Sequence, residues 1–343
     1  MVEWKKLDTC LDFEQPTAYL VKSTEYDDSY DTPVLTAGQS LLLGYTNETD
    51  GIYEASKDNP CIIFDDFTTS FHWIDYNFKV KSSAMKMLRP KDNVNFRYIY
   101  YTMKCINFVP GGHQRHWISK YSQFEVPLPS LSEQNRIVGI LDTFTSSIDN
   151  LKQQIVQRRK QYEYYRDQLL DLEGKEGVEM KMLGDLTDKI SSGRNKNKLE
   201  EGLYPVFGST SIIAFTNTFI YDKELILVAR VGANAGYVYM SDEKCDVTDN
   251  TLIVETKDEY SRKFIYYYLV YKNINQYAKG GGQPLITGGL LKELFIPVPS
   301  LSEQQRIVDI LDKFEASIQN LEAQLSQREK QYEYYRNKLL TFE

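Results

Sequence analysis

Apolar residues recur in alternating steps of four and three along two stretches of the chain, residues 131–173 and 301–343. A sustained average step of 3.5 residues is typical of a coiled-coil seam. Each stretch therefore predicts one long helix of about 60 Å, because every helical residue adds about 1.5 Å. The main seam positions are Ile137, Leu141, Phe144, Ile148, Leu151 and Tyr162 in the first helix, and Ile307, Leu311, Phe314, Ile318, Leu321 and Tyr332 in the second.

The two stretches are copies of each other, with about 28 of 43 aligned positions identical and no gap. Each is preceded by Pro-x-Pro-Ser, in which proline fixes the backbone and serine can cap the helix. Glu133 and Glu303, three residues after Ser130 and Ser300, complete a capping-box pattern. A helix of this length cannot bury its seam alone, so the two copies are predicted to pair with each other.

Arg158 and Arg328 interrupt the seam at the same place in both copies. They can extend past a wide seam, with the aliphatic stem on apolar surface and the charge in water. They can also fix the register of the pair as polar residues that oppose slippage. The sequence leaves both interpretations open.

Residues 1–130 and 174–300 have the pattern of two globular domains with one layout. Strand-like runs between turn signals are predicted at 40–43, 61–64, 77–80 and 85–88, and at 225–230, 237–240 and 251–255. A tyrosine-rich helix is predicted after each set of strands, at 96–106 and 261–271. The expected fold class is α+β, with two mixed α/β domains, a pair of long helices and an internal repeat.

The composition, with 42% hydrophobic residues, is that of an ordinary globular protein. The sequence has no signal-peptide pattern and no apolar run near 18 residues, so we expect a soluble cytoplasmic protein. The net charge is −8, and neither the globular segments nor the long-helix segments are basic overall. An anionic ligand must therefore contact a local basic patch, or a partner protein must supply the positive field.

Motifs for catalysis or cofactor binding are weak. The turn at residues 231–236 lacks the G-x-G-x-x-G spacing of a dinucleotide site, and the chain has no G-x-x-x-x-G-K-[ST] phosphate loop. His113 and His116 have no cysteine or carboxylate ligands beside them, so no metal site is predicted. Asp249, Glu255 and Lys257 faintly imitate the D…E-x-K pattern of metal-dependent nucleases. We expect no chemistry in this chain, and a nuclease with these three residues is an alternative.

Short runs of hydrogen-bond donors stand at equivalent places in the two globular domains. Lys and Arg contact phosphate, glycine lets the backbone approach it, and Asn, Gln, Ser and Thr can read base edges. One such run is typical of a solvated surface, but two in duplicated domains favour DNA binding. The candidates are Thr68, Thr69, Ser70, Lys79, Lys81, Lys86, Arg89, Gly112, His113, Gln114, Arg115 and His116 in the first domain, and Arg194, Asn195, Lys196, Lys198, Arg230, Asn234, Lys279, Gly281 and Gln283 in the second.

The long-helix segments carry a family resemblance. Residues 129–142 read Pro-Ser-Leu-x-Glu-Gln-x-Arg-Ile-Val-x-Ile-Leu-Asp, residues 162–170 read Tyr-Glu-Tyr-Tyr-Arg-x-x-Leu-Leu, and both motifs recur in the second copy. In these motifs, and in the alternation of domain and helix over essentially all 343 residues, the chain resembles the specificity subunits of type I restriction–modification systems.

The resemblance implies a non-catalytic subunit that reads a bipartite double-stranded DNA sequence. Each globular domain would be a target recognition domain for one half-site, and antiparallel long helices would set the spacer. Two methyltransferase subunits would dock on the helices, and two restriction and translocation subunits would join them. S-adenosylmethionine, ATP and Mg²⁺ are expected on these partner subunits, with no cofactor in this chain and no membrane association.

Two further alternatives stay open on the sequence alone. The chain can be a specificity subunit that serves a fused methylase–nuclease. It can also be a scaffold without a DNA ligand, whose paired modules bind proteins or glycans through tyrosine-rich faces.

Overall fold

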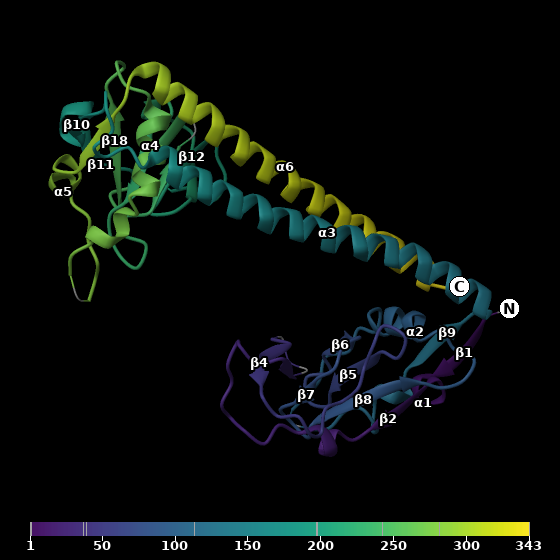
Figure 1. The fold of residues 1–343 in the computed structure, drawn as a ribbon. Helices are drawn as coiled ribbons and strands as arrows, with labels where there is room; N and C mark the ends of the chain where they lie inside the picture. Colours follow the sequence, from purple (N-terminus) through teal and green to yellow (C-terminus); the bar gives the residue numbers. More distant parts are fainter. Residues whose placement is uncertain are drawn as a thin grey trace. The chain divides into compact units, whose positions relative to one another are not determined.

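The chain folds into two compact units, and the computed structural model describes residues 2–36, 38, 40–112, 114–196, 198–241, 243–280 and 282–342. The first unit comprises residues 1–151 and 324–343, and the second comprises residues 152–323. Two long helices, α3 (Leu131–Leu170) and α6 (Leu301–Leu340), each contribute one part to either unit (Figure 1). Within the described ranges, no helix combines the length and the apolar character needed to cross a membrane.

The first globular domain, residues 2–130, contains three small sheets and a helix, α2 (Phe96–Met103). The sheets have the strand orders β2-β8-β5-β6, β4-β3-β7 and β1-β9. The other elements are β1 (Glu3–Lys6), α1 (Leu7–Cys10), β2 (Leu11–Glu14), β3 (Thr32–Leu35), β4 (Leu42–Thr46), β5 (Cys61–Asp65), β6 (Phe71–Ile74), β7 (Lys79–Val80), β8 (Met85–Pro90) and β9 (Glu125–Leu128).

The second globular domain, residues 174–300, contains three corresponding sheets and a helix, α4 (Arg262–Tyr271). The sheets have the strand orders β11-β18-β15-β16, β13-β12-β17-β14 and β10-β19. The other elements are β10 (Glu179–Met182), β11 (Thr187–Ser192), β12 (Tyr204–Phe207), β13 (Ile212–Thr216), β14 (Tyr221–Asp222), β15 (Ile226–Ala229), β16 (Val238–Met240), β17 (Lys244–Val247), β18 (Thr251–Thr256), α5 (Gly288–Lys292) and β19 (Phe295–Val298).

The sheets of the two domains share one strand order, to which the second domain adds β14. The sheets β2-β8-β5-β6 and β11-β18-β15-β16 are antiparallel. The sheets built on β3 and on β12 each contain one parallel pair, β3–β7 or β12–β17. The register shifts at the same point of both second sheets, at Val34/Leu35 and Val206/Phe207. The predicted fold class, with two mixed domains, long helices and an internal repeat, is thereby confirmed.

Several predicted elements are present with shifted ends, and others were missed. The helix predicted at 96–106 is α2, which ends at Met103. Strands β3 and β12 were missed because each contains a proline, which argues against a central strand. Pro33 and Pro205 fit there because the parallel neighbour begins its pairing one residue later, opposite Val34 and Val206.

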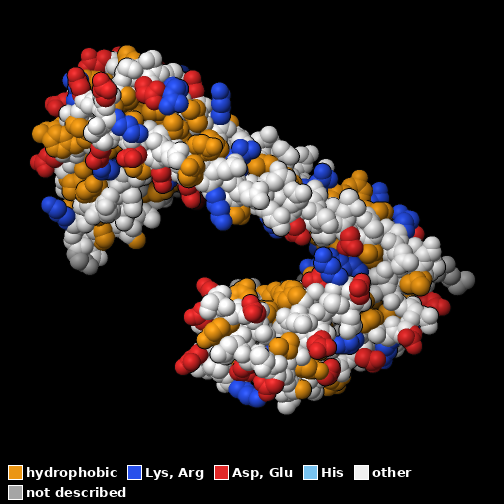
Figure 2. All heavy atoms as spheres, viewed as in Figure 1, with side chains coloured by type: hydrophobic (Ala, Val, Ile, Leu, Met, Phe, Trp, Pro, Cys, Tyr) orange, Lys and Arg blue, Asp and Glu red, His pale blue; other side chains and the backbone are white. Residues whose placement is uncertain are grey.

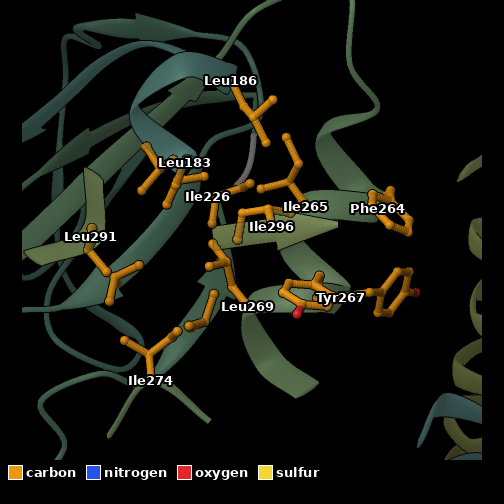
Figure 3. Packing of buried hydrophobic residues seen from close by; sticks show 14 of the residues in the cluster. Leu183, Leu186, Ile226, Phe264, Ile265, Tyr267, Leu269, Ile274, Leu291 and Ile296 are labelled. Carbon is orange, nitrogen blue, oxygen red and sulfur yellow. The ribbon is translucent and has the colours of Figure 1, made fainter. Parts of the chain in front are cut away.

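Each domain buries an apolar core between its helix and its antiparallel sheet. In the first domain, the Phe64 ring packs edge-on against Trp117, with ring centroids 5.0 Å apart. In the second domain, Ile226, Ile265, Leu269 and Ile296 gather between strand and helix (Figure 3). Full burial of one such side chain contributes about 1.5–3 kcal/mol, so these contacts hold helix and sheet together.

Seam residues at the start of each long helix complete these cores. Ile137 and Leu141 of α3 are fully buried in the first core, as are Ile307 and Leu311 of α6 in the second. The end of the opposite long helix joins each core through Leu340 in the first unit and Leu170 in the second. Each globular domain is therefore packed on both long helices.

Farther along, the seam residues pair the two helices. Phe144 stacks on Tyr335 at 5.3 Å in the first unit, and Phe314 stacks on Tyr165 at 5.5 Å in the second. Within the second unit Arg159 also pairs with Glu322, so the helices run antiparallel. Of the other predicted seam residues, Ile148 is buried, whereas Leu151, Tyr162, Ile318, Leu321 and Tyr332 are half-buried.

The two seam arginines lie over aromatic rings of the opposite helix. The Arg158 guanidinium is 5.9 Å from the centre of the Phe314 ring, and the Arg328 guanidinium is 5.7 Å from that of Phe144. Such cation–π contacts contribute about 0.5–1 kcal/mol at exposed sites. The two arginines therefore contact an aromatic ring of the opposite helix. Neither the extension into water nor the polar fixing of the register described this contact.

The starts of the long helices use only half of the predicted capping box. Glu133 N donates to Ser130 Oγ at 3.4 Å, and Glu303 N donates to Ser300 Oγ at 3.3 Å. The two glutamate side chains, however, pair with arginines one turn along, at 2.7 Å each. The reciprocal half of the capping box is therefore corrected, because the nearby arginine competes for the carboxylate.

Candidate DNA interface and helix-pair surface

Backbone hydrogen bonds bring loops together at one end of the second globular domain. Arg230 N donates to Asn250 O, and Ile286 N donates to Arg230 O, both at 2.9 Å. Gly232 N also donates to Pro284 O at 3.0 Å. The segment after β11 joins them through the loop between β17 and β18. We call the described residues of 193–198, 230–237, 248–250 and 279–286 the second loop edge.

Glycine is required where the segment after β11 meets the end of β17. A Cβ on Gly193 would lie 2.3 Å from the carbonyl oxygen of Val247. Gly193 N donates to Thr251 O at 3.0 Å, and Asn195 N donates to Val247 O at 2.9 Å. The close backbone approach therefore presents Arg194 and the residues after it at the loop edge.

The predicted donors of the second domain lie on this edge. Arg230 and Asn195 are half-buried and engaged, since Arg230 Nη1 donates to Asp249 O at 3.4 Å and Asn195 Nδ2 to Asp246 Oδ2 at 2.5 Å. Gly281 lies outside the described residues. The exposed predicted donors are Arg194, Lys196, Lys198, Asn234, Lys279 and Gln283.

The first globular domain has an equivalent edge built on Asp66. Asp66 N donates to Ala84 O at 3.0 Å, and His116 N donates to Asp66 O at 2.8 Å, which repeats the bonding of Arg230. We call the described residues of 65–70, 81–84 and 111–117 the first loop edge. The two edges thus share a backbone framework, with an acidic residue at the position that is basic in the second domain.

Four of the donors predicted in the first domain are buried, and these assignments are corrected. Lys86 pairs with Asp66 at 3.1 Å and Lys79 with Glu48 at 3.0 Å, and both lysines are 1% exposed. An ammonium group enclosed in this way cannot reach a phosphate. The other two are Thr69, which has a positive φ of 58° in the turn after β5, and His116.

The remaining donors of the first domain divide by accessibility. Arg89 is half-buried, and its Nε donates to the Tyr53 hydroxyl at 2.7 Å, so its charge is already engaged. The Thr68 hydroxyl bonds that of Ser70 at 2.6 Å. His113 lies outside the described residues. The exposed predicted residues are Thr68, Lys81, Gly112, Gln114 and Arg115.

Sequence reasoning did not select Asn250 and Tyr237, which are exposed on the second loop edge. Asn250 holds Arg230 through its carbonyl group. Aligning the strands of the two domains could have found it, because Ala84 and Asn250 both come directly before the strand next to β5 or β15. On the face shown in Figure 2, basic and acidic side chains are interspersed over each domain.

Comparison with known proteins matches both halves of the chain to one family. The sequence profile of the Type I restriction modification DNA specificity domain matches residues 2–158 and again residues 175–329. The chain belongs to the type I specificity-subunit family. The two matched segments each contain one globular domain followed by part of a long helix, in agreement with the internal repeat.

Members of the family resemble the chain along nearly its whole length. The EcoR124I/EcoR124II specificity subunit of Escherichia coli is 38% identical, over 99% of this chain and 94% of its own. A putative type I specificity subunit of Haemophilus influenzae is 28% identical, over 99% of this chain and 96% of its own. The solved S subunit of M. genitalium has the same fold, with a TM-score of 0.76 at 19% identity, covering 100% of this chain and 97% of its own.

The residues of the alternative nuclease site do not converge. Asp249 precedes β18 and Glu255 stands near the end of that strand, six residues later, which separates them by about 20 Å. Glu255 pairs instead with Lys223 at 2.9 Å. The D…E-x-K cluster of the alternative nuclease site is therefore not formed by Asp249 and Glu255.

Four tyrosines of the tyrosine-rich helices are buried, whereas Tyr100, Tyr266 and Tyr271 are half-buried. Tyr98 and Tyr101 of α2, and Tyr267 and Tyr268 of α4, are at most 1% exposed. Their side chains fill the cores and contact the long helices.

A groove of about 650 Å³ runs along the helix pair of the second unit. It combines two cationic side chains with aromatic and aliphatic walls, and its lining includes Arg158, Tyr165, Leu169, Arg306, Ile310 and Phe314. Each of these six residues has an identical counterpart in the repeat of the first unit, namely Arg328, Tyr335, Leu339, Arg136, Ile140 and Phe144, whereas Gln168 of the lining corresponds to Lys338. The stacked aromatic pair and the overlying arginine are present in both units.

Proposed function

We propose that this chain is the DNA-specificity subunit of a type I restriction–modification complex, and that each loop edge reads one half of a bipartite DNA sequence. The observation that carries this proposal is the pair of loop edges, which share a backbone framework and differ in side chains. Base edges in the DNA grooves are read by side chains, whereas the scaffold only positions them. Two different edges on one repeated scaffold therefore fit two different half-sites.

The charges of the loop edges support a shared role in DNA binding. Arg194, Lys196, Lys198 and Lys279 are exposed on the second loop edge and suit phosphate contacts. The first loop edge has fewer exposed basic side chains, Lys81 and Arg115. Lys86 lies nearby but is buried in its ion pair with Asp66. With a net charge of −8, the chain needs partner subunits to supply much of the positive field.

The duplicated groove supports docking of two copies of one partner, which we assign to the methyltransferase subunits. The two long helices kept similar sequences while the globular domains diverged, as binding of one shared partner would require. In this proposal the chain has no catalytic role, and restriction and translocation subunits join the complex. S-adenosylmethionine, ATP and Mg²⁺ would be carried by the partner subunits.

Charge reversal in the groove tests the docking. The double change Arg158→Glu and Arg328→Glu should weaken methyltransferase binding at least tenfold, because it cancels the positive charge of the arginine pair on each side of the repeat. The matched control is Lys160→Glu, an exposed residue of the same helix outside the groove lining. Equal binding by the groove variant and the control would contradict the assignment.

Methylome sequencing tests the function as a whole. A host that expresses this chain with its cognate methyltransferase should acquire methyladenine in a split, asymmetric sequence. The same host with the methyltransferase alone should lack it. An intact complex that adds no methylation and binds no DNA would overturn the proposal.

A further inference from the structure

The same polar contacts attach each globular domain to the long helix that follows it. Gln134 is 1% exposed; its Oε1 accepts a hydrogen bond from Asn95 N at 2.9 Å, and its Nε2 donates to Pro129 O at 2.9 Å. Gln304 does the same in the second unit, between Ser261 N at 3.0 Å and Pro299 O at 2.9 Å. Each glutamine thus ties the residue that caps α2 or α4 to the start of the long helix.

A carboxylate two turns farther along makes the second attachment. Asp142 Oδ1 accepts from Arg97 Nε at 2.9 Å and from the Tyr101 hydroxyl at 2.5 Å. Asp312 accepts from Lys263 Nζ at 2.7 Å and from the Tyr267 hydroxyl at 2.6 Å. We call Gln134 with Asp142, and Gln304 with Asp312, the two clamps.

The geometry of the clamps suits them to orient α2 or α4 on the long helix more than to stabilise the fold. The ion pairs are partly exposed, with 42% of the Asp142 side chain accessible, and exposed pairs contribute little to folding. The two contacts on each aspartate come from residues four apart in α2 or α4, which lie on one helix face. Together with the glutamine at the helix start, they fix both the rotation of α2 or α4 and its tilt on the long helix.

We propose that the two clamps are positioning elements that set the angle of each loop edge to its long helix, and thereby the length of the DNA spacer that the protein accepts. This inference rests on the proposed function. One base pair corresponds to about 3.4 Å of rise and about 35° of rotation along the duplex. A domain free to turn on its helix by an angle of this size would tolerate a spacer one base pair longer or shorter.

The test compares the spacers methylated by complexes that carry wild-type chain, Asp312→Ala or Asp142→Ala. Each variant should raise the ratio of methylation at spacers one base pair off to that at the native spacer about tenfold, with both half-site sequences unchanged. Asp312→Asn keeps an acceptor for Tyr267 and should give a smaller rise. Asp309→Ala, at an exposed position of the same helix, should give none.

The outcomes separate positioning from a merely structural role. Lower methylation at the native spacer alone, with no gain at other spacers, would overturn the proposal, as would altered half-site bases. Tyr267→Phe removes one hydroxyl and leaves the buried ring, so it covers the case in which Asp312→Ala fails to fold. Tyr267→Phe should also raise the ratio of methylation at spacers one base pair off to that at the native spacer.

A second measurement does not depend on methylation. In the full chain with Cys105→Ser, spin labels at Glu293 and Lys313, two exposed positions of the second unit, report the distance between domain and helix. Asp312→Ala should broaden the distance distribution relative to Asp309→Ala. An unchanged width of the distance distribution would overturn the proposal that the clamp positions the domain. A wild-type complex without bipartite methylation would count against the proposed function instead.

Discussion

At the scale of single residues, one position shows how a duplicated fold acquires two chemistries. Asp66 and Arg230 make the same two backbone hydrogen bonds in their domains. Asp66 is buried against Lys86, whereas Arg230 is half-buried at the rim of its loop edge and has Leu252 at the place of that lysine. The charge is buried in an ion pair in the first loop edge, whereas in the second it lies at the rim on a guanidinium group that already donates to Asp249 O.

Arg230 should matter for one half-site only. We expect Arg230→Ala to raise the Kd for target DNA about tenfold, or about 1.4 kcal/mol, and to relax the bases of one half-site. Filter binding and methylome sequencing measure the two effects. Lys189→Ala is the control, because Lys189 pairs in register with Glu255 at the other end of the sheet. A change in both half-sites would contradict this assignment.

The His116 side chain is buried and has no hydrogen-bond partner among the residues that the structure describes. It is 0% exposed, both ring nitrogens are unpartnered, and its ring packs on Phe108 at 5.4 Å. The equivalent residue of the second domain is Ile286, also 0% exposed. An unsatisfied buried donor or acceptor costs about 1–3 kcal/mol.

Replacing this histidine should therefore stabilise the first domain. We expect His116→Ile to raise the free energy of unfolding by about 1–2 kcal/mol, as measured by denaturant titration or native-state hydrogen exchange. The reverse change, Ile286→His, should destabilise the second domain. A lower stability of His116→Ile would mean that the imidazole makes a stabilising contact in solution.

At the scale of elements, the two clamps differ in the group beside the tyrosine hydroxyl. The Tyr101 hydroxyl is 3.4 Å from Thr145 Oγ1, whereas the Tyr267 hydroxyl is 3.0 Å from Glu315 Oε2 in addition to Asp312. Burial raises the pKa of Glu315 above its ordinary value, against the opposing effect of hydrogen bonds from Tyr267 and Tyr162. The contact between α4, α3 and α6 therefore contains a carboxyl group whose pKa lies above that of an exposed glutamate.

This difference predicts a pH dependence confined to the second unit. Because the folded pKa of Glu315 is raised, its stabilising contribution is present below the unfolded pKa of about 4.3 and is lost as the pH rises through the folded value. Glu315→Gln should remove this loss and raise the melting temperature of the second unit at pH 7.5 by a few degrees. Glu333→Gln, an exposed position of α6 in the first unit, is the control. Equal pH profiles of wild type and Glu315→Gln would refute the prediction.

At the scale of the whole molecule, the repeat makes the two halves separable. Each globular domain has its own core and its own loop edge, and each is attached to the helix pair by its own clamp. The helix motifs that receive the domains are nearly the same in both copies. Modules with equal attachment points and different edges are expected to be exchangeable.

Exchange of residues 1–130 for the corresponding domain of another family member should change one half of the methylated sequence and leave the other half intact. The spacer should stay the same, because Gln134 and Asp142 remain with the helix. Methylome sequencing of the chimera reads both. A change in both half-sites would show that the domains do not act independently.

Much of the fold was predictable because it depends on patterns that repeat along the chain. The step of 3.5 residues and the two copies predicted the paired helices, and α2 and α4 lie where the tyrosine-rich runs were found. The candidate site was less predictable, since a lysine in a strand looks the same whether it faces solvent or an aspartate. Lys79 and Lys86 were selected for their charge, and only their burial excludes them.

By itself, the sequence determined the architecture, the internal repeat and the family resemblance, because periodicity and duplicated motifs are properties of residue order. The tertiary structure decided which charges are available and what the duplicated motif does. Gln134 and Asp142 look like ordinary polar positions of an exposed helix, and only folding brings Asn95, Arg97 and Tyr101 to them. Their partners lie some 40 residues away in sequence, as the separations of 39, 45 and 41 residues show, and such contacts leave no local pattern.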